Sequence, residues 1–125
     1  MTMSMKPTAA EVITAGGWSS RYARVLVVEG NGTRALALVD TNGDGREINE
    51  NRYWRDESGS WHSGSSSGSV PSRPATHPFG FWRDKQGVVS AYGRTATAGP
   101  VTVEVDDRVI EAVATDGGWW VWLRP

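Results

Sequence analysis

"RYARVLVVEGNGTRALALVD", residues 21–40, is the stretch that decides the fold class. Two runs rich in aliphatic and β-branched residues flank Asn31-Gly32, a dipeptide that favours a β-hairpin because both central residues of a type I′ turn need positive φ. We therefore expect one strand on each side of this dipeptide. From Arg21 onward, further short β-rich runs alternate with turn signals at about the spacing typical of a sandwich or barrel.

The C-terminal stretch "VTVEVDDRVIEAVATDGGWWVWLRP", residues 101–125, predicts three further strands. Valine alternates with polar residues over 101–105, which indicates one buried and one solvated face. Asp106-Asp107 and Asp116-Gly117-Gly118 supply the turns of a meander. The last strand, residues 119–123, is apolar on both sides, so we expect it in the middle of a sheet or beneath a helix.

One short helix precedes the strands. Thr8 and Glu11 have the spacing of a capping box, and the segment after them ends in a glycine pair, so the sequence predicts about two turns of helix. With 125 residues, we expect a single β-rich domain over residues 1–125. The predicted fold is all-β: an antiparallel β-sandwich of about seven to eight strands with this helix, the alternative being an open β-barrel.

Residues 63–78, "SGSSSGSVPSRPATHP", are rich in Ser, Gly and Pro and predict a flexible surface loop inside the domain. The sequence nearly repeats itself on either side of this loop: "YWRDESG" at 53–59 matches "FWRDKQG" at 81–87. One interpretation is two similar hairpins. The other is a recognition surface, because Trp and Arg are enriched at binding hot spots. The residues expected on this surface are Trp54, Arg55, Trp61, Trp82 and Arg83.

The composition excludes several classes of protein. A formal net charge of −1, with 13 basic and 14 acidic residues spread along the chain, makes nucleic acid an unexpected partner. The absence of cysteine removes disulfides and thiolate sites. No apolar run has the length of a signal peptide or membrane span, so we expect a soluble, cytoplasmic protein with no membrane partner. The oligomeric state stays open.

The loop "DTNGDG", residues 40–45, has oxygen-bearing side chains at the spacing of a calcium loop. Asp40, Asn42 and Asp44 would supply side-chain ligands, Arg46 its carbonyl, and Glu47 or Glu50 the final carboxylate. Locally the segment resembles the opening of EF-hand and dockerin loops, which implies calcium as a cofactor. The alternative is a turn, in which the two aspartates bond their own backbone.

The two histidines, His62 and His77, lie 15 residues apart and share no metal-ligand spacing with a second acid. No serine elbow follows a strand and leads into a helix, so we expect no enzyme. Function is expected to be non-enzymatic binding, with a protein partner engaged through the Trp and Arg surface. The alternative is a calcium-stabilised β-module with an aromatic, carbohydrate-binding surface.

Residues 91–125 also carry a resemblance. A Tyr-Gly-Arg at 92–94 precedes a Val-rich meander and an aromatic-rich final strand at 119–122. In this order the segment resembles one found in small, uncharacterised actinobacterial β-domains. The resemblance implies a β-sandwich-like bacterial domain and brings no activity with it.

Overall fold

The computed structural model describes residues 4–125 and is mostly β, with one short helix and nine strands in antiparallel sheets. The all-β prediction is confirmed, with nine strands in place of seven to eight. None of the sheets formed by residues 4–125 closes into a barrel. In chain order the elements are α1 (Ala9–Gly16), β1 (Arg24–Gly30), β2 (Arg34–Asp40), β3 (Ile48–Arg55), β4 (Trp61–Ser67), β5 (Gly80–Asp84), β6 (Gly87–Arg94), β7 (Gly99–Val105), β8 (Arg108–Ala114) and β9 (Trp119–Leu123).

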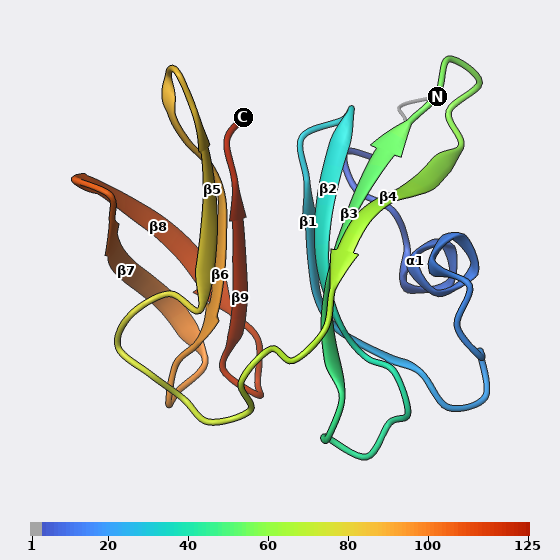
Figure 1. Ribbon diagram of the computed structural model, residues 1–125, viewed down its shortest axis with the longest axis horizontal. Helices are drawn as coiled ribbons and strands as arrows, with labels where there is room; N and C mark the ends of the chain where they lie inside the picture. The colour runs from blue at the N-terminus through green and yellow to red at the C-terminus, as the bar shows by residue number, and fades with distance from the viewer. Residues whose placement is uncertain (1–3) are drawn as a thin grey trace.

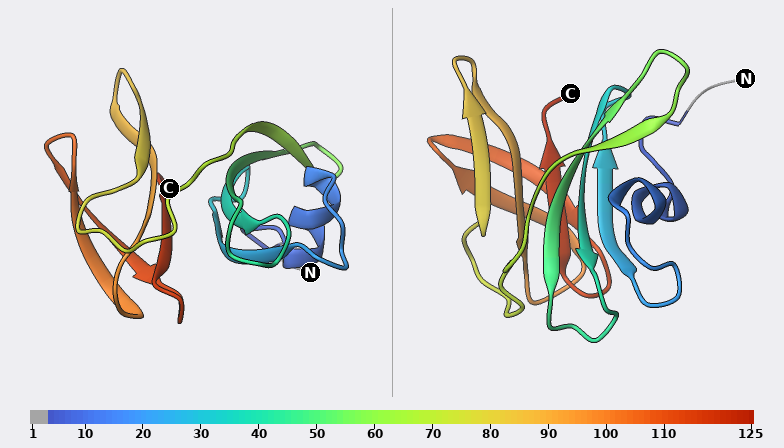
Figure 2. Two further views of the ribbon diagram at one scale, coloured as in Figure 1. Left: turned by 60° about the horizontal axis from the view of Figure 1, so that its bottom comes forward. Right: turned by 45° about the vertical axis from the view of Figure 1, so that its right-hand side comes forward.

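The elements stack in layers. The first sheet has the order β1-β2-β3-β4, the second sheet has the order β5-β6-β9, and β7 and β8 form a separate outer hairpin. The helix lies on the outer face of the first sheet, and the outer hairpin lies on the far side of the second sheet (Figures 1 and 2). Each sheet therefore has apolar side chains on both of its faces.

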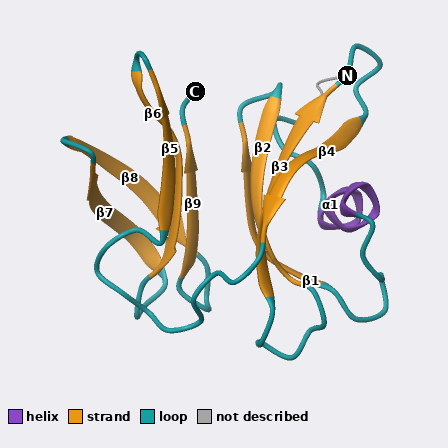
Figure 3. Cartoon of the chain, viewed as in Figure 1, coloured by secondary structure: helices purple, strands orange, loops and turns teal. Residues whose placement is uncertain are grey.

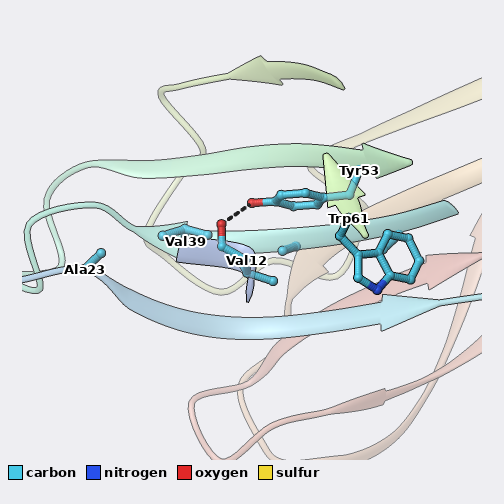
Figure 4. Close-up of a cluster of buried hydrophobic side chains, with 7 residues drawn as sticks. Val12, Ala23, Val39, Tyr53 and Trp61 are labelled. Atoms are coloured by element: carbon cyan, nitrogen blue, oxygen red, sulfur yellow. Dashed lines mark hydrogen bonds between the residues drawn. The ribbon is translucent and has the colours of Figure 1, made fainter. Parts of the chain in front are cut away.

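A buried cluster of side chains fills each of the three spaces between layers. Strand β2 shows how, because its successive side chains point to opposite faces. Ala35, Ala37 and Val39 pack beneath the helix, whereas Leu36 and Leu38 pack against the second sheet. Figure 4 shows the cluster beneath the helix, where the Tyr53 hydroxyl donates a hydrogen bond of 3.0 Å to the carbonyl of Val12.

The N-terminal helix begins where its sequence predicts. Thr8 caps it: the Thr8 side chain accepts a hydrogen bond from the backbone N–H of Glu11 at 3.2 Å, and the Glu11 carboxylate accepts one from the N–H of Thr8 at 3.0 Å. Gly17 ends the helix in the left-handed region, with φ of 78°. The capping box fixes both the helix start and the direction in which Val12 enters the core.

The first hairpin, β1-β2, is confirmed, but its turn differs from the prediction. Strand pairing ends at Gly30 and Ala35, and in the turn only Gly32 has positive φ. The Asn31 side-chain oxygen accepts hydrogen bonds from the backbone N–H groups of Thr33 and Arg34. This side-chain cap favours a longer turn over the two-residue type I′ geometry, which the structure places instead at Asp106-Asp107.

The prediction of a C-terminal meander is wrong in one respect. Strands β7 and β8 pair as expected, but β9 pairs with β6 and occupies an edge of the second sheet rather than its middle. It is apolar on both sides because it lies between two layers. Trp119 and Val121 face the first sheet, and Trp120 faces the outer hairpin.

The Ser-rich loop begins later than predicted. Residues 63–67 belong to strand β4, and residues 68–79 form the connection between the two sheets without helix or strand (Figure 3). Strand β4 needs few apolar side chains because it is an edge strand that is exposed over residues 63–67. Backbone pairing with β3 suffices to hold it there.

Candidate binding cleft

An open cleft of about 400 Å³ lies between the two sheets, with an exposed tryptophan from each. Trp54 of β3 is 41% exposed and Trp82 of β5 is 52% exposed. Residues that line the cleft are Arg34, Arg52, Tyr53, Trp54, Gly64 and Trp82. Large exposed aromatic rings in a concave surface are typical of binding sites, because burying them against a ligand is favourable.

Strand register explains why two arginines accompany the tryptophans. Arg34 of β2 stands directly opposite Trp54 of β3, and Leu36 stands opposite Arg52. Residues two apart along a strand share a face, so both arginines and Trp54 face the second sheet. Leu36 and Leu38 lie on the same face of β2 in the buried part of the space between the sheets. At the exposed end of this space, the corresponding residue of β2 is Arg34.

A smaller, deeper pocket of about 100 Å³ adjoins the cleft and shares four of its lining residues: Arg34, Arg52, Tyr53 and Trp82. Its remaining lining comes from both sheets and is mostly apolar: Asn31, Ala35, Leu36, Val89, Ser90 and Leu123. The cleft and this deep pocket together therefore form one site, with a wide aromatic entrance and an apolar floor.

The charges at the entrance are not balanced. The guanidinium of Arg52 stacks on the Trp82 ring, 4.8 Å from its centroid. Its Nε also lies 2.9 Å from the Glu50 carboxylate, but the N–H does not point along that line, so the contact is a charge pair without a well-formed hydrogen bond. Arg34 has no carboxylate within 4.0 Å among residues 4–125. The entrance is therefore cationic.

Glu50 is buried between the sheets, and polar groups surround it. Its second carboxylate oxygen accepts a hydrogen bond of 2.9 Å from the Ser67 hydroxyl. Burial, with a smaller contribution from the Glu50 charge, raises the pKa of the nearby Tyr92 phenol. Arg52 and Ser67 thus hold the Glu50 carboxylate below the cleft.

His62 stacks on Trp54 beside the cleft and is not one of its lining residues. Its ring stacks on Trp54 with centroids 4.5 Å apart, and its Nε2 lies 2.6 Å from the Asp56 carboxylate. Hydrogen bonds from the Ser58 side chain and then from His62 lower the pKa of Asp56, which stays ionised. The Asp56 and His62 pair holds the imidazole flat against Trp54.

Three of the five residues expected on the Trp and Arg surface lie elsewhere. Trp61 is buried beneath the helix, 6% exposed, with the Arg55 guanidinium stacked over it at 4.6 Å. Arg83 pairs with Asp106 of the outer hairpin at 2.6 Å. Neighbouring residues on a strand point to opposite faces, so Trp54 and Arg55 cannot share one surface. Only Trp54 and Trp82 meet in the cleft.

Sequence reasoning missed Arg34 and Arg52 as partners of these tryptophans. A signal for Arg52 was present, because residues 48, 50, 52 and 54 form one face of a strand. Which face would meet the second sheet depends on how the sheets pack, and no local pattern carries that information. The repeated Trp-Arg-Asp motif pointed to Trp54 and Trp82, whereas its arginines, Arg55 and Arg83, lie outside the cleft.

The predicted calcium loop is closed by hydrogen bonds within the chain. Asp40, 6% exposed, accepts backbone N–H groups from Gly43 at 3.1 Å and Gly45 at 2.8 Å. Asp44 accepts the N–H of Arg46 at 3.0 Å. The Asn42 side chain donates to Glu47 at 3.4 Å.

Glu50 does not belong to this loop. It lies on β3 opposite Leu38 and faces the second sheet, as described above. Within residues 4–125 no group of three or more acidic or histidine side chains converges as a metal site. The hydrogen bonds favour the turn interpretation, and calcium binding by the remaining loop residues stays a prediction.

Comparison of the chain with protein-family models, with curated proteins and with solved structures found no match. The resemblance of residues 91–125 to actinobacterial β-domains therefore stays a hypothesis. Among residues 4–125, no helix has the length and apolar composition needed to cross a membrane.

Proposed function

We propose that the protein is a non-enzymatic binding module that holds a segment of another protein in the cleft between its two sheets. One observation carries the proposal: two exposed tryptophans from different sheets and two arginines line a single cavity of about 400 Å³. Trp and Arg dominate binding hot spots, where aromatic anchors enter desolvated pockets surrounded by polar groups.

The exposed rings can supply a useful share of the binding free energy. A tryptophan buries up to about 250 Å², so covering a half-exposed ring removes roughly 100 Å² from water. At roughly 25 cal/mol per Å², each ring contributes about 2–3 kcal/mol before the entropy of association is subtracted. Two such rings support a complex of moderate affinity, as expected for a small module.

The charges support an acidic partner. Arg34 has no carboxylate partner within residues 4–125 and can pair with one from the ligand. Arg52 keeps its planar guanidinium stacked on Trp82, from which it can donate in a fork geometry. Glu50 is held by Arg52 and Ser67, an arrangement suited to fixing the cleft's shape rather than to transferring protons.

Two peptide-display libraries would test the proposal. In one, the random segment is fixed at both ends, and in the other it ends in a free carboxylate. We expect binders in at least one library that are lost on Trp54→Ala and on Trp82→Ala. Phe81→Ala is the matched control, because Phe81 is 45% exposed on the same strand but points to the opposite face from Trp82. Binders that bind all three variants equally, or no binders in either library, would overturn the proposal.

A further inference from the structure

We infer that the cleft recognises the C-terminal end of its partner: the last side chain, an aliphatic one, enters the deep pocket, and the terminal carboxylate pairs with Arg34 and Arg52. This inference rests on the binding function proposed above and specifies what is bound. It follows from the size of the deep pocket, from the charge at its rim and from the geometry of an extended chain.

The deep pocket fits one aliphatic side chain. Its volume of about 100 Å³ is below the ~150 Å³ of a cavity that admits benzene, so an aliphatic side chain suits it better than an aromatic ring. Leu36, Val89 and Leu123 provide apolar contacts from both sheets. A branched aliphatic side chain would fill this volume without leaving a polar atom unpaired.

The charge at the rim matches one carboxylate. Arg34 and Arg52 together carry two positive charges, of which the neighbouring Glu50 offsets one. A single negative charge on the ligand would therefore neutralise the site. Hydrogen bonds between guanidinium and carboxylate are charge-assisted and often bidentate, and they are worth more than neutral ones.

The carboxylate must lie close to the aliphatic side chain, because Arg34 and Arg52 line both the deep pocket and the cleft. In an extended chain, neighbouring side chains point to opposite faces, and side chains on the same face are two residues or about 6.6 Å apart. An acidic side chain next to the buried one would point out of the cleft. The α-carboxylate of the buried residue itself can lie beside the buried side chain, because it belongs to the same residue. Only a C-terminal residue has a free α-carboxylate.

The rest of the partner would leave through the wide part of the cleft, between Trp54 and Trp82. Gly64 of β4 lines this exit, at an irregularity in the pairing of β3 and β4. Without a side chain, this position leaves bare backbone at the wall, which is typical of a place where another backbone approaches closely.

Nuclear magnetic resonance with three short peptides would test the inference. The probes are acetylated Ser-Ala-Ala-Leu with a free carboxylate, the same peptide with a C-terminal amide, and acetylated Ser-Ala-Leu-Glu amide, which carries an internal acid. Indole N–H signals of Trp54 and Trp82, assigned with Trp→Phe variants, report binding. We expect the free acid to bind at least about tenfold more tightly than either amide, because hydrogen bonds between a guanidinium and a carboxylate are stronger than neutral ones.

Arg34→Gln should remove most of the preference for the free acid over its amide, because it deletes one of the two guanidinium groups at the rim. Arg21→Gln, at an exposed arginine that stacks on Tyr22 away from the cleft, is the matched control and should bind like the wild type. Equal binding of acid and amide, or no shift with the free acid at millimolar concentration, would overturn the inference. Library binders from fixed-end segments alone would leave the proposed function standing while overturning C-terminal recognition.

Discussion

At the scale of single residues, arginine and tryptophan are paired throughout the molecule. A guanidinium stacks within 5.0 Å of the ring centroid of Trp61, Trp82, Trp119 and Trp122. Such cation–π contacts contribute about 0.5–2 kcal/mol each and let an arginine cover a ring that would otherwise meet water. Much of the Trp and Arg content thus serves the fold. Trp54 differs from these four, because its ring stacks on His62.

Asp40 should stabilise the protein as the centre of a turn. Asp40→Ala removes two hydrogen bonds from backbone N–H groups to a buried carboxylate, so we expect the free energy of unfolding to fall by about 2 kcal/mol. Asp44 accepts a single backbone bond on the exposed side of the same loop, and Asp44→Ala should cost less than about 1 kcal/mol. Thermal or urea unfolding in EDTA would measure both losses.

The same variants decide the calcium hypothesis. An ion bound only to the native state raises stability by about 2.7 kcal/mol at a hundredfold excess over Kd, which shifts the melting temperature by several degrees. From the turn interpretation we expect equal melting temperatures in EDTA and in millimolar calcium. A calcium-specific rise that both Asp40→Ala and Asp44→Ala abolish would instead make the loop a metal site.

Tyr53 should make stability sensitive to alkaline pH. Burial raises the pKa of its phenol to about 12, from an ordinary value of 10. The unfolded chain loses this proton near pH 10 while the folded chain keeps it, so the stabilisation is complete below pH 10 and is lost as the pH rises towards 12.

Tyr53→Phe tests this sensitivity. It leaves the Val12 carbonyl without its donor and should cost about 1–2 kcal/mol at neutral pH. The gap between wild type and variant should narrow in urea titrations between pH 10 and 11.5. Tyr22→Phe is the control, because Tyr22 is 53% exposed, and it should follow the wild type across this range. A constant gap for Tyr53→Phe would show that the buried phenol does not titrate with folding.

At the scale of secondary-structure elements, local patterns predicted each strand better than its partner. The capping box at Thr8, the hairpin around Asn31 and the alternation over 101–105 are signals between near neighbours, and all three agree with the structure. The pairing of β9 with β6 joins residues far apart in sequence, such as Arg94 and Trp119. Such a pairing depends on which surfaces pack best, and alternation within β9 cannot specify it.

The cleft, too, could be predicted from the sequence only in its local features. The repeat of Trp-Arg-Asp predicts two similar strand ends, and the structure has them, with the Asp56 and Asp84 side chains each accepting a backbone N–H in the turn that follows. Trp54 faces the second sheet and Trp82 faces the first. This arrangement depends on how the two sheets stack. Arg34 joins them through its position opposite Trp54, which becomes known only with the register of β2 and β3.

The Tyr-Gly-Arg sequence of β6 has a packing role that explains each residue. Tyr92 contacts the cluster between the two sheets, and Arg94 stacks on Trp119 and donates to the carbonyl of Gly117. Gly93 faces the other way and lies against the ring of Trp120. A Cβ added at position 93 would come within 2.7 Å of that ring.

Gly93→Ala should therefore be destabilising. Trp120 is 1% exposed and cannot move without disturbing the outer hairpin, so we expect a loss of about 2–3 kcal/mol from overpacking. Gly64→Ala is the control on an exposed part of β4, where an added Cβ would lie 3.3 Å from the Arg52 carbonyl oxygen, a tight contact that a small shift of this edge strand can relieve, and it should change stability by less than about 1 kcal/mol. Equal losses for both variants in urea unfolding would contradict this packing role.

At the scale of the whole molecule, the stacked layers predict a gradient of local stability. Strand β2 lies at the centre: it pairs with a strand on each edge and is buried on both faces. Within residues 4–125, β7 and β8 pair only with each other, and their outer face exposes Val109 and Val113. Segments with few buried contacts and exposed hydrogen bonds open at lower free energy. The outer hairpin should therefore open without the rest.

Amide hydrogen exchange would measure this gradient. We expect the slowest exchange in β2 and its neighbour β3, and exchange faster by at least about tenfold, or about 1.4 kcal/mol, in β7 and β8. Val103→Ala, in the cluster beneath the hairpin, should speed exchange in the hairpin alone. Leu38→Ala, between the two sheets, should speed it in every layer, because global unfolding sets the slowest rates. Val109→Ala is the matched control, since Val109 is 64% exposed, and should alter neither. If all strands exchanged at one rate, the layers would form a single cooperative unit. The binding cleft would then share the stability of the whole protein, whereas in the gradient expected here it lies beside a layer that opens by itself.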